Sequence, residues 1–189
     1  GYGGYLTLNG NYFDSTETVL EKSYGYSSTG LYGSSFDTIL KVKTKMTLGH
    51  FDQKAPVVFS ASKGKNLLGM DFLNQFDVVL DWNAKTVELY PTNLKTPKIK
   101  SFGITPKWNE DKLIVGTVSK GSLAEKDGIK VGDVIVKLNR WNFREPHLET
   151  YCEMMLELHS KKTSVLNLEL EDGRSYTFDK ENLTGIAEQ

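Results

Sequence analysis

The sequence predicts a mainly β chain with short helices, divided into two parts. Three observations predict it: short runs alternate apolar and polar residues, glycine-containing turns separate these runs, and a polar, proline-containing stretch lies near the middle. That stretch, "TNLKTPK" at residues 92–98, is expected to link a first domain at residues 1–93 to a second at residues 98–189. A chain of 189 residues can hold two small hydrophobic cores.

The opening residues predict a strand, a turn and a short helix. Residues 3–8 ("GGYLTL") alternate as in a strand, and the Asn9-Gly10 pair after them is typical of a tight turn. Asp14 or Ser15 is then expected to cap a short helix through "STETVLEK", because their side-chain oxygens can accept the free amides of a first helical turn.

A long hairpin is predicted for residues 24–45, where strand-like runs flank a centre rich in glycine and serine. Glycines at its tip allow a positive φ, and the two residues between them offer an apolar and an amphipathic side chain to a ligand. The tip consists of Gly30, Leu31, Tyr32 and Gly33. An ordinary exposed hairpin is the alternative interpretation of the same residues.

Two further strands, "TKMTLGHF" and "APVVFSAS", are expected around a turn at Gly49. Residues 66–91 then combine a Leu-Leu-Gly sequence, a short helix and a hairpin that turns at Asn83. In the helical part, the side chains of Phe72, Leu73 and Phe76 share one face, which we expect to be buried.

The second half has a different pattern. A strand in "KLIVGTVSKG" precedes a short helix with Ser122 as N-cap and Gly128 at its end, and "DVIVKLN" forms the next strand. Pro146 suits the first turn of a longer helix. The apolar stripe of this helix is expected to contain Leu148, Tyr151, Cys152, Met155 and Leu158 or His159. A final hairpin should turn at Asp172-Gly173.

Composition argues against several classes of function. The formal net charge of −1 and the mixed signs along the chain give no basic surface for nucleic acid or an anionic membrane. No run approaches the roughly 20 apolar residues of a membrane span. A single cysteine and three scattered histidines show no metal-ligand spacing, and no glycine-rich nucleotide motif is present, so neither a metal nor a cofactor is expected.

The second half resembles a PDZ domain of the circularly permuted bacterial type over residues 100–181. The most specific part of the resemblance is "GSLAEKDGIKVGDVIVKLN", in which a helix of small residues leads through a "GIKVGD" turn into a strand. Such domains bind an extended peptide as an added strand beside a helix, and exposed backbone amides receive its terminal carboxylate.

The resemblance implies a set of peptide-binding residues. The sequence "SFGI" lies where the family keeps its amide-rich loop; a glycine there lets the backbone approach an anion, and the flanking apolar residues would line a pocket. The helix would offer His147 or Leu148 in addition, although core packing explains the helix residues equally well. The expected peptide-binding residues are Ser101, Phe102, Gly103, Ile104, Tyr151 and Met155.

The first half resembles the pepsin and retropepsin-like aspartic proteases of bacteria over about residues 3–91. In that family, a strand with two apolar residues and a glycine leads into a short helix beneath the active site, and a hairpin comes next; "NLLGMDFLNQFDVVLDWNAKTVELYP" is similar to this element. The tip "STGLYGSS" is similar to the flap that closes over a substrate. The resemblance implies a half-barrel of the acid-protease type.

The chemistry of that family needs an aspartate in an Asp-Thr-Gly or Asp-Ser-Gly turn, paired with a second such turn. Neither sequence occurs in this chain. Because "GYGGYLTL" is similar to the segment that comes after the catalytic aspartate in these proteases, we expect that aspartate just upstream of Gly1, so that no catalytic residue lies in this chain. Asp71 is interpreted as a helix-start residue that suits the helix dipole, and not as a catalytic carboxylate.

The sequence therefore suggests a fragment of an aspartic endopeptidase with a peptide-binding PDZ domain, inactive by itself. The alternative is a non-catalytic scaffold that binds peptides or proteins through the PDZ groove. Expected partners are a peptide or protein substrate, a C-terminal peptide in the groove, and an N-terminal part or second chain that supplies the aspartate. Export to the periplasm or cell surface is expected from family analogy alone.

Overall fold

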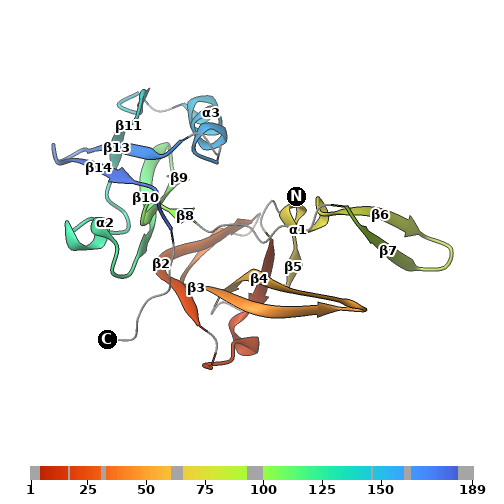
Figure 1. The fold of residues 1–189 in the computed structure, drawn as a ribbon. Coiled ribbons are helices and arrows are strands. Elements are labelled where there is room, and N and C mark those ends of the chain that lie inside the picture. The colour runs from red at the N-terminus through yellow and green to blue at the C-terminus, as the bar shows by residue number, and fades with distance from the viewer. Residues whose placement is uncertain are drawn as a thin grey trace. The chain divides into compact units, whose positions relative to one another are not determined.

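The computed structural model describes residues 5–16, 18–30, 33–60, 66–92, 100–145, 147–159 and 163–182. The chain forms two compact units, one of residues Gly1–Leu20 and Ile39–Ile99 and the other of Glu21–Thr38 and Lys100–Gln189. The architecture is mainly β with a few short helices, as predicted (Figure 1). No helix within the described ranges is long and apolar enough to cross a membrane.

The first unit is built on a sheet of short and long strands. Strand β1 (Leu6–Asn9) pairs in parallel with β4 (Phe51–Ser60) and antiparallel with β5 (Leu67–Leu68). On its other side, β4 pairs antiparallel with β3 (Gly33–Leu48), in a ladder that joins Ile39 to Ser60 at one end and Leu48 to Phe51 at the other. The predicted turn between these strands is confirmed, and Gly49 takes a φ of 59° in it.

The predicted strand, glycine and helix sequence is also confirmed. Strand β5 is followed by Gly69, which is the N-cap of α1 (Met70–Leu73) and donates its amide to the carbonyl of Tyr5 (2.9 Å). Phe72 is fully buried and Phe76 is 7% exposed. The ring of Phe72 packs against those of Tyr5 and Phe76, so this turn carries the apolar face that the sequence predicted into a small core.

Beyond α1, strands β6 (Phe76–Asp81) and β7 (Thr86–Pro91) form a two-stranded hairpin that extends away from the helix (Figure 1). Its turn is fixed by Asp81, whose carboxylate accepts the amides of Asn83 and Ala84 (both 2.8 Å). Lys85 completes the turn with a φ of 55°. The hairpin leaves six large apolar side chains exposed: Val78, Val79, Leu80, Trp82, Val87 and Tyr90.

One predicted element is wrong. The described residues after Asp14 form no helix; instead the carboxylate of Asp14 accepts the amide of Thr16 (2.9 Å), and β2 (Val19–Gly30) begins three residues after Thr16. A side chain that bonds an amide two residues ahead stabilises a turn as readily as a helix start. The only helical turn near this point among the described residues is a short 3-10 helix, η1 (Gly10–Tyr12).

The second unit joins two sheets around one core. Strand β10 (Lys112–Ser119) pairs with β9 (Ile104–Asn109) on one side and with β2 on the other, with Ser119 opposite Ser23 and Thr117 opposite Gly25. The other sheet has the order β12 (Trp141–Asn142), β11 (Ile135–Leu138), β13 (Val165–Leu170) and β14 (Ser175–Asp179). A short pair joins β8 (Lys100–Ser101) to β15 (Glu181–Asn182).

Two helices complete this unit. Helix α2 (Leu123–Lys126) begins as predicted at Ser122, whose hydroxyl accepts the amide of Glu125 (3.2 Å), and Gly128 follows it with a φ of 79°. Helix α3 (Leu148–His159) packs on the core through Tyr151, Met154, Met155 and Leu158. Pro146, predicted for the first turn of this helix, lies outside the described residues.

The predicted stripe of α3 is partly wrong. Met154 is fully buried, whereas Cys152 is exposed and Leu148 is 56% exposed. A short helix can meet its core at two adjacent positions because each turn holds 3.6 residues. The exposed residues of the predicted stripe, Leu148 and Cys152, then lie outside the contact between the helix and the core.

Candidate functional site

Strand β9 presents a free edge beside a helix. It pairs with β10 on one side, and no other strand in the described part of the chain pairs with its outer side. Helix α3 approaches this strand through Tyr151, whose ring centroid lies 5.7 Å from that of Trp108 on β9. An open strand edge next to a helix is the geometry that accepts an added peptide strand.

Hydrogen bonds and a close approach to Ser122 restrict the loop before β9. Gly103 has a φ of 80°, its amide donates to the hydroxyl oxygen of Ser101 (3.0 Å), and its carbonyl accepts the amide of Ser119 (2.7 Å). A Cβ atom on Gly103 would lie 2.6 Å from that of Ser122. Only glycine fits this position, because a side chain would combine an unfavourable φ with a collision.

The floor beside this loop is apolar. Ile104 is 6% exposed and belongs to the main core, against which the half-buried Phe102, Tyr151 and Met155 pack. The ammonium group of Lys180 lies 5.1 Å from the ring centroid of Phe102. The structure thus gathers the six residues that the sequence singled out around one core, at the start of β9 and along α3.

Tyr151 lies beside the end of β9 that is farther from the loop. Its ring centroid lies 5.7 Å from that of Trp108. Burial raises the pKa of Tyr151, and a hydrogen bond from the backbone of Trp108 opposes that rise. The phenol therefore stays neutral at neutral pH, with its polar tip at the strand and its ring against the core.

A residue that the sequence did not single out supports the loop. Glu21 on β2 is 3% exposed, and its carboxylate accepts hydrogen bonds from the hydroxyl groups of Ser119 and Ser101; the bond from Ser101 is 3.0 Å long. The amide of Lys120 also donates to the carbonyl of Lys22 (2.6 Å). No local pattern could have found Glu21, because its partners lie 80 and 98 residues later in the sequence.

The predicted flap is described only at its ends. Strand β2 ends at Gly30 and β3 begins at Gly33, whereas Leu31 and Tyr32 lie outside the described residues. Closer to the base of the hairpin, the rings of Tyr26 and Phe36 meet edge to face with centroids 5.9 Å apart. A grip on substrate by this tip stays a prediction.

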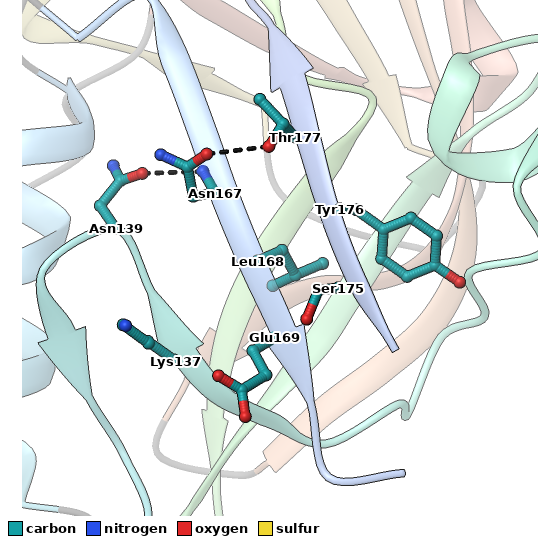
Figure 2. A pocket seen from close by; sticks show the side chains of 8 residues that line it. All are labelled: Lys137, Asn139, Asn167, Leu168, Glu169, Ser175, Tyr176 and Thr177. Atoms are coloured by element: carbon teal, nitrogen blue, oxygen red, sulfur yellow. Dashed lines mark hydrogen bonds between the residues drawn. The ribbon is translucent and has the colours of Figure 1, made fainter. Parts of the chain in front are cut away.

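A polar hollow of about 420 Å³ lies on the sheet of β11, β13 and β14 (Figure 2). Within it, the hydroxyl of Thr177 donates to the side-chain oxygen of Asn167 (2.9 Å), and the amide of Asn167 donates to the side chain of Asn139 (2.8 Å). These bonds join neighbouring strands, so the groups stabilise the sheet. None of the residues predicted to bind peptide lines this hollow.

The described residues hold no group of three or more metal-ligating side chains. Asp71 lies in the first turn of α1 and is exposed. The structure brings no second carboxylate to it among the contacts of the described chain.

Comparison with known proteins agrees with the second unit. Residues 92–171 match the family model of the PDZ domain, and they include β9, β10, α2, α3 and β13. No curated protein and no solved structure matches the chain significantly. The comparisons therefore support a PDZ domain at residues 92–171 and lend no support to a protease-like first half.

Proposed function

We propose that this chain binds extended peptide segments, which add as a strand to the outer edge of β9 and face α3. The observation that carries the proposal is the free edge of β9 next to a helix, within a segment that matches the PDZ family. Backbone hydrogen bonds to the edge would supply affinity without regard to sequence. The half-buried Phe102 and Met155 would supply an apolar surface for alternate side chains of the peptide.

A library of fluorescein-labelled dodecapeptides, each made with a free carboxylate and with an amide end, tests this binding by fluorescence anisotropy. Met155→Glu places a charge on the apolar surface and should weaken the best ligand about tenfold or more. Leu156→Glu is the matched control, because Leu156 is the next residue of α3 and 76% exposed. It should leave the affinity within about twofold.

Two outcomes would contradict the proposal. One is a library in which no peptide binds the folded chain, with folding checked by circular dichroism. The other is equal affinity for the two glutamate variants, which would mean that ligands bind elsewhere on the surface.

We propose, as a second function, that residues 1–93 derive from a retropepsin-like aspartic peptidase whose catalytic aspartate lies upstream of Gly1. The observation that favours this origin is the succession of β5, Gly69, α1 and the β6–β7 hairpin. A non-catalytic scaffold that works through the PDZ domain is the competing proposal, and the division into domains at residues 93 and 98 belongs to both.

Peptide cleavage separates these two proposals. The 189-residue chain should cleave no peptide at acidic or neutral pH, whereas a longer chain with an upstream Asp-Thr-Gly or Asp-Ser-Gly sequence should cleave, and lose activity when that aspartate becomes asparagine. Cleavage by the 189-residue chain that stops on Asp71→Asn would overturn the assignment of the aspartate. An upstream sequence without either motif supports the scaffold.

A further inference from the structure

We propose that the groove accepts an internal stretch of a partner chain, without a free C-terminal carboxylate at the Ser101–Gly103 loop. This inference rests on the proposed function and names its class of ligand. Its basis is that the loop amide nearest to the start of β9, that of Gly103, already donates to the hydroxyl oxygen of Ser101 (3.0 Å). A terminal carboxylate would have to displace this oxygen to use the amide.

The displaced oxygen is itself held in place. The hydroxyl hydrogen of Ser101 is donated to the carboxylate of Glu21 (3.0 Å), so the lone pairs of the Ser101 oxygen are directed toward the loop. Glu21 is 3% exposed and also accepts from Ser119, which fixes the carboxylate from the side of β10. The chain from Glu21 through Ser101 to Gly103 thus supplies the acceptor that a ligand carboxylate would otherwise provide.

The backbone on the carbonyl side of Gly103 is anchored as well. Its carbonyl accepts the amide of Ser119 (2.7 Å), and the position of a Cβ atom lies 2.6 Å from Ser122. The Gly103 amide belongs to the preceding peptide group, so its direction is set by the bond to Ser101 and the carbonyl is held separately by Ser119. The ammonium group of Lys180, a cation near the loop, already has partners. It donates to the carbonyl of Leu158 (3.4 Å) and lies over the ring of Phe102.

An internal segment needs none of these groups. It pairs through its backbone with β9, continues past the loop at one end, and leaves the strand where the ring of Tyr151 packs on that of Trp108. The stretch left for pairing is short, Ile104–Lys107, which suits a brief extended segment that enters and leaves the groove.

The test uses the full chain and the tightest dodecapeptide from the library, made as the free acid, as the amide, and with a Gly-Ser extension beyond its last residue. We expect the three forms to bind within about twofold of each other. Ser101→Ala frees the Gly103 amide, and the free acid should then bind about fivefold tighter than the amide. Ser175→Ala, at an exposed serine of β14, is the control and should leave the ratio unchanged.

A free acid that binds the unmodified chain tenfold tighter than the amide and the extended form would overturn the inference while leaving the proposed function intact. A library in which no peptide binds would remove both. Hydrogen exchange needs no ligand and tests the blocked amide directly. The Gly103 amide should exchange about tenfold faster in Ser101→Ala, and equal rates would contradict its engagement by Ser101.

Discussion

The two units differ in how they bury their apolar side chains. Among the described residues, the PDZ-containing unit encloses fourteen buried side chains in one cluster, whereas the first unit has two clusters of four and three. The first unit also leaves the apolar side chains of the β6–β7 hairpin exposed, with Trp82 at 82%. Packing therefore dominates the stability of the second unit, and the long β3–β4 ladder carries more of it in the first.

The largest expected effect tests this contrast in the cores. Phe178 and Phe72 are both nearly inaccessible, at 2% and 0% exposed. Phe178→Ala should cost about 4–5 kcal/mol, because its dense surroundings cannot collapse into the cavity, and Phe72→Ala about 3 kcal/mol in its smaller cluster. Urea unfolding followed by circular dichroism measures both. A larger loss for Phe72→Ala would reverse the ranking of the two units.

A second prediction compares glycines in the two units. Gly25 on β2 has a φ of 142°, and an added Cβ would lie 2.0 Å from the carbonyl oxygen of Gly116. Gly25→Ala should therefore cost about 2–4 kcal/mol by separating β2 from β10. Gly49→Ala, in a turn with a φ of 59° and open space around it, should cost only about 1 kcal/mol.

Equal losses from these two variants, measured by urea unfolding, would show that β2 contributes no more to its unit than an ordinary turn. Hydrogen exchange of the β2 amides adds a local readout, since they should lose protection in Gly25→Ala alone.

A third, smaller effect concerns the charge beneath β2. The Lys107 ammonium group is inaccessible, has no hydrogen-bond partner among the described residues and lies 3.8 Å from the ring centroid of Tyr26; burial lowers its pKa. Because the unfolded chain binds this proton more tightly, stability should rise as pH increases from the lowered pKa toward about 10.5.

Lys107→Met removes that rise, which unfolding measured at pH 7 and at pH 10 would detect. At pH 7 the variant should change stability by less than about 1 kcal/mol. The loss of the cation–π contact offsets the gain from no longer burying a charge. Lys120→Met, at an exposed lysine, should keep the wild-type pH dependence. A rise that persists in Lys107→Met would assign it to another group.

The smallest effect is expected in the exposed hairpin. Trp82→Ser should change the free energy of unfolding by less than about 0.5 kcal/mol, because the side chain is already 82% exposed. It should lower the binding of a hydrophobic dye by the folded chain. A loss of several kcal/mol would mean that the hairpin contributes to a core. The first unit would then resemble the second in how it buries apolar side chains.

Local signals in the sequence were sufficient for most of the fold. The Leu-Leu-Gly turn into α1, the Ser122 cap and the Asp172-Gly173 hairpin all depend on residues within a few positions of one another. The helix expected after Asp14 failed because its competitor is distant: β2 is fixed by pairing with β10, where Gly25 lies opposite Thr117. Polar, buried Glu21 and Ser23 give no strand-like apolar pattern.

The candidate site was predictable in part for the same reason. The loop residues Ser101 to Ile104 could be located from a recognisable order of strand, helix and turn. The support from Glu21 and the packing of Tyr151 on Trp108 depend on which segments meet in space. Sequence periodicity gives the phase of a helix and does not name the strand that it faces.

The pairing of β2 with β10 has a consequence for biosynthesis. Residues 23–25 leave the ribosome more than ninety positions before residues 117–119, their partners in the ladder. Strand β2 can therefore pair with β10 only after more than half of the chain has been translated. A polypeptide that started at residue 98 would lack β2 and leave the unpaired edge of β10 open to aggregation.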